Sequence, residues 1–501
     1  MIKIIIYIYI IINMIIKFSN GFSNGPNSSP KIQKMNISPP RELLRYRAYK
    51  KCRKRLQETL IQQGCNSRRG WVRSFERWQL VGKLLEDLDG IDDINNEIST
   101  FKLDPMIPTK QCPLSQEILI QDLTALKGMD ASKATIVAKD LAEYSRKMAE
   151  GVSKLKEEVL NAPGVGLIHK EIQESKVRKW NSKSTNNDEN NNTENNTNTN
   201  TNTNTNTEKD NDKKISVRES QMVLLHMGEH TDQKFSISQT IFDNLYKKWR
   251  HHNPRISSHK FLNEVFCLLT RYSALEAWGY QAALTPEVFT CLNTHFNTNT
   301  ECFASALNHH YPYYYSMFPD LERNFGSGGS FFDSTSFNPD EGSFEANPPF
   351  VQVFMLEMLF KIHRLLSKAS GPLSFAIIVP AWKEEEGWVA LNSSPYLKHE
   401  PIIIEAENHA YADGSGYRRP DWDGRARPAP FPSGVFFLQN DKGREKWPVT
   451  QEKIDALRIS FKAANPDDNL VKRIKSTGLY TPKKYRSKRD RNHNDNQNHS
   501  H

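Results

Sequence analysis

Paired cysteines are missing from this chain. Its 501 residues include six cysteines, and none of them belongs to a C-x-x-C pair. They are scattered along the sequence, at Cys52, Cys65, Cys112, Cys267, Cys291 and Cys302. Such spacing argues against a disulfide framework and a structural zinc site, and it favours a reducing compartment. We therefore expect no metal site.

Long hydrophobic runs are also scarce. The apolar run from Ile4 to Ile16 is shorter than the roughly 20 residues that cross a bilayer, and it lacks the small-residue cleavage site of a signal peptide. We expect residues 1–35 to be a dispensable or disordered leader, with Met35 the better-placed start, and we expect no membrane partner. A cleaved or anchoring signal is the alternative.

Acidic residues are outnumbered by basic ones, 58 to 67, which gives a formal net charge of +9. This balance favours a polyanionic partner, with nucleic acid first among the candidates. Residues 476–501 form a basic tail that we expect to be disordered and to serve as a nuclear address or a nonspecific RNA contact. Residues 181–214 are rich in Asn and Thr, cannot bury a core, and should be a disordered insertion.

Residues 36–180 predict a helical domain. Ser38 can cap a helix whose first turn holds Pro39 and Pro40, and the helix closes at Gly64. The following segment, "NSRRGWVRSFERW", alternates arginines with Trp71, Phe75 and Trp78. Such a pattern can bind phosphates and stack bases, or it can be a solvated helix face above buried rings. The sequence leaves both interpretations open.

Residues 215–475 predict an α/β domain with helical elements at its start. "SQMVLLHMGEHTDQKFSIS" predicts a hairpin, and "LSFAIIVPAW" is the short unbroken apolar run of a strand buried on both faces. Before it, apolar residues from Val351 to Leu366 recur at helical spacing. The succession strand, loop, helix, strand is a βαβ crossover, so the sheet should be largely parallel and doubly wound.

The loop of that crossover is "NPPF", Asn347 to Phe350. In a doubly wound sheet, ligands bind at the carboxyl ends of the strands, where this loop should lie. Methylation of the exocyclic amine of adenine needs two acceptors that orient both N–H bonds, rather than a general base. Asn347 and the Pro348 carbonyl can be those acceptors, Pro349 stiffens the turn, and Phe350 can stack on the base. A plain loop with a core Phe is the alternative.

Several blocks of sequence then carry a resemblance in register. They are "ECFASALNHHYPYYYSMFPD", "FGSGGSFFD", "GSFEANPPF", "PLSFAIIVPAWKE" and "FFLQNDKGREKW". From about Phe75 to Trp447 the chain resembles the cap-specific adenosine N6-methyltransferases, the CAPAM or phosphorylated-CTD-interacting-factor family. The resemblance implies a Rossmann-like, doubly wound class I methyltransferase domain with a mainly helical RNA- and cap-binding accessory domain.

The same resemblance implies an activity and its site. The chain would use S-adenosyl-L-methionine to methylate N6 of the 2′-O-methyladenosine next to the 7-methylguanosine cap of mRNA, in the nucleus. Asn347 to Phe350 would form the catalytic and cofactor-adjacent loop, and Phe325 and Gly326 of the glycine-rich stretch would flank the cofactor, unless that stretch is a flexible loop without a ligand. The residues expected to line the substrate are Arg77, Gln116, Gln352, Trp382, Lys383, Glu384, Glu405 and Glu407.

The chain departs from the family pattern at three points. Gln116 stands where a second cap-contacting arginine is expected, and Gln352 stands where a glutamate is expected. We find no N-terminal WW module with its paired tryptophans, which weakens the expectation of binding to the RNA polymerase II machinery. Two alternatives therefore stay open: an N6-adenine methyltransferase of other RNA or DNA, and a catalytically inactive binder of capped RNA or of the transcription machinery.

Overall fold

The computed structural model describes residues 37–65, 70–92, 104–108, 113–154, 222–226, 234–275, 281–406, 408–414, 416–418 and 426–463. The leader, the Asn/Thr-rich insertion and the basic tail lie outside these ranges. What the sequence predicts for those three segments stays a prediction.

A six-stranded sheet organises one half of the molecule, in the order β4-β3-β5-β6-β10-β7. Strands β4, β3, β5 and β6 are parallel neighbours, whereas β10 runs antiparallel to both β6 and β7. The strands are β3 (Thr300–Ala304), β4 (Tyr313–Ser316), β5 (Gly342–Ala346), β6 (Leu373–Pro380), β7 (Ile402–Ile404) and β10 (Ser433–Gln439). The prediction of an α/β protein with a largely parallel sheet is confirmed.

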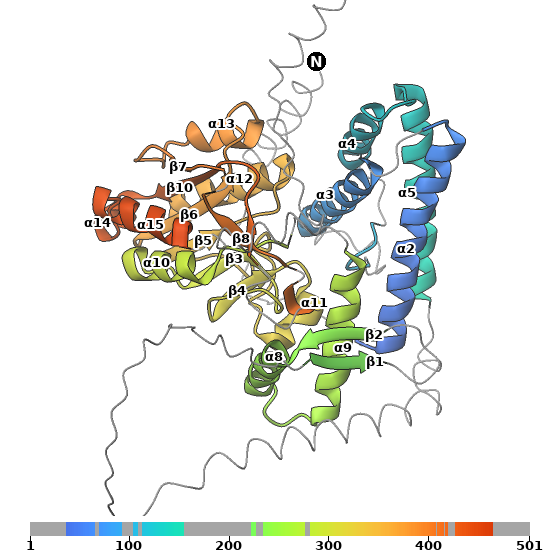
Figure 1. The fold of residues 1–501 in the computed structure, drawn as a ribbon, viewed down its shortest axis with the longest axis horizontal. Coiled ribbons are helices and arrows are strands. Elements are labelled where there is room, and N and C mark those ends of the chain that lie inside the picture. The colour runs from blue at the N-terminus through green and yellow to red at the C-terminus, as the bar shows by residue number, and fades with distance from the viewer. Residues whose placement is uncertain are drawn as a thin grey trace, which may run out of the picture.

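Helices cover both faces of this sheet (Figure 1). Helices α10 (Pro286–Phe296) and α15 (Gln451–Ala463) pack on one face, and α12 (Gln352–Lys368) and α13 (Glu386–Asn392) pack on the other. Strand β6 is buried along its whole length, as its unbroken apolar run predicts. Strand β5, helix α12 and parallel strand β6 form the predicted βαβ unit.

Several short elements remain. They are α11 (Pro319–Glu322), α14 (Asp441–Lys446), the 3-10 turns Arg323–Phe325 and Gly416–Arg418, and the antiparallel pair β8 (Ala410–Ala412) and β9 (Ala426–Pro428). The side chain of Asn440 accepts a hydrogen bond from the Gly443 N–H at 2.8 Å and so caps α14.

The other half is helical and combines segments that lie far apart in the sequence (Figure 1). Its first part is α2 (Pro39–Gln62), α3 (Gly70–Asp92), α4 (Pro113–Thr124) and α5 (Ala131–Ser153). These helices share a hydrophobic core with α8 (Gln239–His252), α9 (Ser258–Ala274) and the hairpin of β1 (Met222–His226) and β2 (Lys234–Ser238). The Ser38 hydroxyl accepts from the Arg41 N–H at 3.4 Å, which confirms the predicted start of α2.

The rings of the basic-aromatic segment lie inside this helical core. Trp71, Phe75 and Trp78 are buried, and the Phe75 ring lies 5.2 Å from that of Tyr49 and 5.7 Å from that of Trp78. The second interpretation of this segment, in which the rings are buried beneath a solvated helix face, is therefore correct. These three rings are not available to stack on bases.

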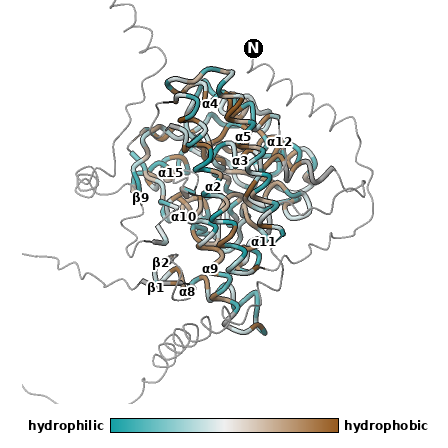
Figure 2. Tube along the Cα trace, turned by 90° about the vertical axis from the view of Figure 1, so that its right-hand side faces the viewer, coloured by the Kyte–Doolittle hydropathy of each residue, from teal (hydrophilic) through white to brown (hydrophobic). Residues whose placement is uncertain are grey.

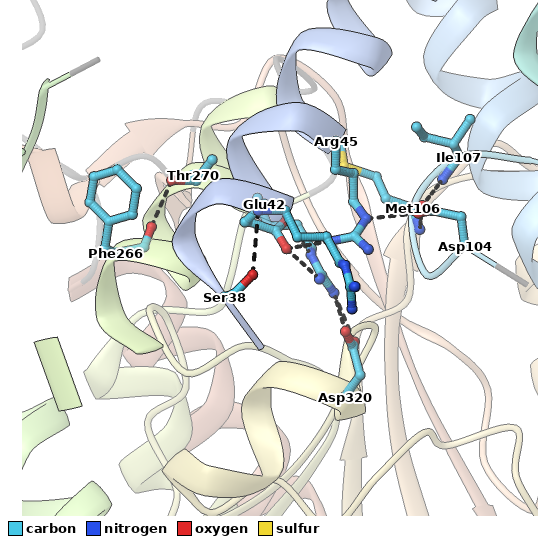
Figure 3. A network of polar contacts seen from close by, with 11 residues as sticks. Ser38, Glu42, Arg45, Asp104, Met106, Ile107, Phe266, Thr270 and Asp320 are labelled. Carbon is cyan, nitrogen blue, oxygen red and sulfur yellow. Dashed lines mark hydrogen bonds and ion pairs between the residues drawn. The ribbon is translucent and has the colours of Figure 1, made fainter. Parts of the chain in front are cut away.

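A buried network of ion pairs joins the two halves (Figure 3). Arg271 of α9 donates through Nε and Nη2 to the Glu42 carboxylate of α2, at 2.9 and 2.8 Å, and through Nη1 to Asp320 of α11, at 2.8 and 2.7 Å. Arg45 also pairs with Glu42 and donates to Asp104 at 2.9 Å. This network fixes α2 and α9 against the short helix that follows β4.

No helix in the described part of the chain is both long enough and apolar enough to cross a membrane. Figure 2 shows hydrophilic and hydrophobic residues mixed along α2, α3 and α5. This pattern is typical of helices that bury one face and expose the other.

Candidate active site

The turn Asn347–Phe350 connects the end of β5 to the start of α12. The Val351 N–H donates to the Pro349 carbonyl at 2.7 Å, and the Met355 N–H donates to the Val351 carbonyl at 3.1 Å. Within the described residues, no backbone N–H bonds to the Pro348 carbonyl. The two prolines fix φ at successive positions, so the turn holds the Asn347 amide and the Pro348 carbonyl stiffly.

This turn lies at the point where the strand order reverses. From β3 the chain passes to its neighbour β4, and it then returns to the other side of β3 to form β5. In open α/β sheets, ligands bind outside the carboxyl ends of the strands at such a point. The carboxyl ends of β3, β4 and β5 are therefore the place to look for a ligand site.

A cavity of about 1090 Å³, counted with the solvent at its mouth, lies at these strand ends. Ser305 and Asn308 follow β3 and line it, and Asn347 and Pro349 of the turn line it from β5. Helix α3 of the helical half borders the cavity as well. Its walls mix polar and apolar side chains, as the walls of small-molecule sites do.

Asn347 lines this cavity and carries an unsatisfied acceptor. Its side chain is only 8% exposed, and Oδ1 is buried without a hydrogen-bond partner in the described part of the protein. A buried acceptor left without a donor costs about 1–3 kcal/mol. The position therefore suits a donor supplied by a ligand.

An aromatic set flanks the turn: Phe350, Trp382, Tyr411 and Phe431. The Phe350 ring centroid lies 6.4 Å from that of Trp382 and 6.0 Å from those of Tyr411 and Phe431, each in an edge-to-face arrangement. The indole Nε1 of Trp382 is buried without a partner among the described residues. Phe350 and Trp382 do not line the cavity, so the turn presents an amide to the cavity and a ring to the aromatic set.

Two buried carboxyl groups lie in the strands next to the turn. Glu301 of β3 and Glu345 of β5 are register partners, and each is 1% exposed. Burial raises the pKa of Glu301 to about 8 and raises that of Glu345 well above its usual range. Glu301 accepts from the N–H groups of His310 and Tyr311, at 2.6 and 2.7 Å. Burial thus disfavours the charged form of both carboxyls, and Glu301 shapes the segment after β3.

Residues 239–414 match a family model described as "Phosphorylated CTD interacting factor 1 WW domain". An mRNA (2′-O-methyladenosine-N(6)-)-methyltransferase from Homo sapiens is 35% identical over 235 residues, which are 45% of this chain and 33% of that protein. The protein of the same name from Mus musculus is 33% identical over 258 residues, which are 50% of this chain and 35% of that protein. This part of the chain is thus similar to the phosphorylated CTD interacting factor family and to two methyltransferases.

The similarity to these family members spans about a third of their length. The segment matched by the family model runs from α8 past β8 and contains the Asn347–Phe350 turn. Its described residues form helices and the parallel strands β3, β4, β5 and β6. The term WW in the family's description therefore does not describe the fold of this segment.

Two residues expected to flank the family's cofactor lie away from the cavity wall. Phe325 is fully buried and packs 6.5 Å from the Phe261 ring, and Gly326 has a φ of +98° beside His252. Neither residue lines the cavity, whereas Ser330 and the residues after it in the same stretch do. The glycine-rich stretch thus reaches the cavity, but through its later residues.

The two residues expected to contact the cap lie on neighbouring helices. Arg77 of α3 donates through Nη1 to Asp122 of α4 at 2.9 Å, and its side chain is 42% exposed. Gln116 of α4 is half-buried. Neither lines the cavity, so their roles toward substrate stay predictions.

The remaining residues expected to line the substrate have different surroundings. Gln352 accepts through Oε1 from the Gly387 N–H at 2.7 Å and so ties α12 to α13. Trp382 belongs to the aromatic set, and Lys383 and Glu384 after it are exposed. Glu405 is exposed too, whereas Glu407 lies outside the described residues.

Several cavity residues escaped the sequence analysis. Ser305 and Asn308 line the cavity because they follow β3, and β3 and β4 are too short, at five and four residues, to show clear alternation. Glu76, Gln79 and Lys83 line it from α3. The signal for the first pair was a cluster of small polar residues after an apolar segment, and the α3 residues gave no local signal.

Proposed function

We propose that this chain is an S-adenosyl-L-methionine-dependent methyltransferase that acts on N6 of the 2′-O-methyladenosine next to the 7-methylguanosine cap of mRNA. We further propose that the sheet half is a Rossmann-like class I methyltransferase domain and that the helical half is an accessory domain for capped RNA. The observation that carries the proposal is the unsatisfied Asn347 amide oxygen beside a cavity at the strand-order reversal. The names of the two relatives support the substrate.

The residues around the cavity fit S-adenosyl-L-methionine. The cavity opens at the carboxyl ends of β3, β4 and β5, and its wall holds amide and hydroxyl groups of Asn347, Ser305 and Asn308. When bound, this cofactor supplies an electrophilic methyl group on a sulfonium. Asn347 and Pro349, which line the cavity from the turn, would border that group.

The turn would orient the amine that receives the methyl group. An amide side chain can rotate by 180° to exchange its oxygen and nitrogen, so Asn347 can direct Oδ1 toward a ligand N–H. The Pro348 carbonyl would accept the second N–H, and the amine lone pair would then point away from both acceptors. Phe350 would hold the plane of the base by stacking. Burial raises the pKa of the nearby Glu301 and Glu345 and so disfavours negative charge beside the turn.

Capped mRNA is the proposed substrate, and the substrate residues are those that the family resemblance implies. Arg77 and Gln116 would face the cap, and Gln352, Trp382, Lys383, Glu384, Glu405 and Glu407 would face the transcript. We also propose a nuclear location and an association with the RNA polymerase II machinery, for which the family's description is the support.

The test is transfer of a tritiated methyl group to RNA that begins with adenosine or guanosine, with and without a cap. We expect transfer to capped RNA that begins with 2′-O-methyladenosine. Equal transfer to uncapped RNA or to DNA would instead favour a general N6-adenine methyltransferase. Cap binding without any transfer would favour an inactive binder.

Asn347→Ala should lower turnover at least about a hundredfold, the scale of one pre-organised transition-state contact. Cofactor binding should mostly survive, because the cavity has other polar walls. Asn244→Ala, at an exposed position of α8, is the matched control and should leave turnover unchanged. An Asn347→Ala protein as active as the control would rule out the acceptor role.

A further inference from the structure

Helix α3 of the helical half borders the cavity close to the turn. Leu80, Val81 and Leu84 of α3 share a hydrophobic cluster with Val351 and Phe354, where α12 begins. Three members of this cluster, Leu80, Leu84 and Phe354, also line the cavity. Because α12 directly follows the turn, this packing holds α3 beside it. A side chain of α3 can therefore contact a ligand that the turn also contacts.

Gln79 of α3 carries a buried acceptor in a fixed orientation. The residue lines the cavity and is 0% exposed. Its Nε2 donates to the Met106 carbonyl at 2.8 Å, and a carbonyl can only accept, so the amide cannot exchange its oxygen and nitrogen without losing this bond. The Asp104 carboxylate fixes the Met106 segment by accepting from the N–H groups of Met106 and Ile107, each at 2.9 Å. Gln79 Oε1 is buried without a hydrogen-bond partner in the described part of the chain.

The surroundings of this acceptor suit an uncharged aromatic ligand. Glu76 and Lys83, the charged residues of α3 that line the cavity, take part in interactions within the protein. Much of the remaining wall is apolar, with Leu80, Leu84, Met317, Phe331, Phe332 and Phe354. Apolar and aromatic side chains contact the faces of a planar ring favourably, and a polar group at the ring edge needs a hydrogen-bond partner when it is buried. The matching ligand is thus a flat ring with an amino donor at its edge.

We propose that Gln79 Oε1 accepts a hydrogen bond from the 6-amino group of the adenine ring of S-adenosyl-L-methionine. Adenine has a 6-amino donor, whereas a 6-oxo purine would place a second acceptor against Oε1. In the proposed mechanism, the amine of the transcript has its acceptors in the turn, so the acceptor of α3 is available to the cofactor. This inference rests on the proposed function, and it assigns recognition of the cofactor's base to the helical half.

The test combines a change in the ligand with a change in the protein. Isothermal titration of the full chain compares S-adenosylhomocysteine with its analogue in which hydrogen replaces the 6-amino group. The unaltered chain should bind the analogue about tenfold more weakly, the scale of one hydrogen bond whose buried acceptor is left unpaired. Gln79→Met should weaken S-adenosylhomocysteine about tenfold and should leave the affinity for the analogue within about twofold. The two changes should therefore not be additive.

A matched variant controls for the loss of a glutamine. Gln121 of α4 is half-buried, bonds to Glu117, and is not among the described residues that line the cavity. Gln121→Met should therefore bind both ligands as the unaltered chain does. Thermal unfolding checks the fold of each variant, and the comparison of the two ligands on the unaltered chain does not depend on any variant.

Equal weakening of both ligands by Gln79→Met would overturn the assignment, because loss of the bond to Met106 would then have distorted the cavity as a whole. Equal binding of both ligands by the unaltered chain would overturn it as well. So would an unchanged affinity of Gln79→Met for S-adenosylhomocysteine with weaker binding of capped RNA that begins with adenosine, measured by fluorescence anisotropy, because Gln79 would then contact the transcript.

These results also separate this inference from the proposed function. Failure of the unaltered chain to bind S-adenosylhomocysteine would overturn both. Normal binding by the unaltered chain without selectivity for the 6-amino group would overturn this inference alone. Selectivity in the unaltered chain that disappears in Gln79→Met would support both.

Discussion

Glu42 is the residue whose removal should most clearly reveal how the two halves are joined. Its carboxylate accepts three guanidinium N–H groups, two from Arg271 and one from Arg45, and its side chain is 3% exposed. Glu42→Gln leaves one acceptor oxygen and places an amide NH₂ against a guanidinium donor. Asp320 still pairs with Arg271, and Asp104 still pairs with Arg45. The variant therefore loses hydrogen bonds without leaving either arginine wholly unpaired.

The expected loss in free energy of unfolding follows from the number of hydrogen bonds and ion pairs that each variant loses. Breaking a buried ion pair by removing one partner costs about 3–5 kcal/mol, and the two remaining carboxylates place Glu42→Gln near 3 kcal/mol. Glu42→Ala removes both acceptor oxygens, and with them all three hydrogen bonds, and should lie near the upper figure of about 5 kcal/mol. For a cooperative unit of about 150–250 residues, 3 kcal/mol lowers the melting temperature by about 6–12 °C.

The pH dependence of this cost has a definite sign. Burial by itself would raise the pKa of Glu42, but Arg271 and Arg45 outweigh it and lower that pKa below its ordinary value of 4.5. A carboxylate with a lowered folded-state pKa stabilises the fold above its unfolded pKa, and that stability is lost as the pH falls through the folded pKa. The difference in free energy of unfolding between the original chain and Glu42→Gln should thus be greatest at pH 7 and should decrease below about pH 4.5.

Thermal unfolding followed by circular dichroism at about pH 7 and at about pH 3.5 to 4 measures this difference in stability. Glu143→Gln is the matched control, because Glu143 pairs with Lys147 on the solvent side of α5 with both side chains more than half exposed. Exposed pairs of this kind contribute about 0.3–0.5 kcal/mol. A Glu42→Gln protein that melts within about 1 °C of the control would refute the reasoning, and a gap independent of pH would refute its electrostatic part.

Two further predictions concern packing and substrate. Gly443→Ala should destabilise the fold by about 1–3 kcal/mol, because an added Cβ would overlap the Leu373 carbonyl oxygen. The control Gly151→Ala has open space around it in α5 and should stabilise the fold by about 0.5–1 kcal/mol. Equal melting temperatures of the two variants would contradict the tight packing of α14 on β6. Arg77→Ala should raise the KM for capped RNA about tenfold and weaken its salt dependence. Arg73→Ala, at an exposed position on the same helix, is the control, and equal KM values for the two variants would move the cap site elsewhere.

Part of the sheet was predictable because its signals are local. The apolar run of β6 and the helical spacing before it depend on residues that are neighbours in the chain, and both appear in the structure as predicted. Strands β3 and β4 were missed because four or five residues are too few to show a period. The aromatic rings of α3 had two interpretations, since a ring that faces a core and a ring that faces RNA have the same spacing along a helix.

The candidate site divides in the same way. The Asn347–Phe350 turn was visible from its prolines and from its place between a strand and a helix. Its unsatisfied amide oxygen and the aromatic set around Phe350 depend on which distant side chains surround it. Phe431 belongs to that set although it lies about 50 positions beyond Trp382 in the chain, so no local pattern could have placed its ring there.

The amino-acid sequence by itself determined the strand, the stiff turn and the amphipathic helix, because backbone dihedrals and burial patterns are set by adjacent residues. Only the tertiary structure decided that residues of α3 line the same cavity as Ser305 and Asn347, which follow β3 and β5. It also brought Arg271 to Glu42, which are 229 positions apart in the chain. Such contacts depend on how whole helices pack against the sheet, and that packing is the sum of many side chains that no single segment specifies.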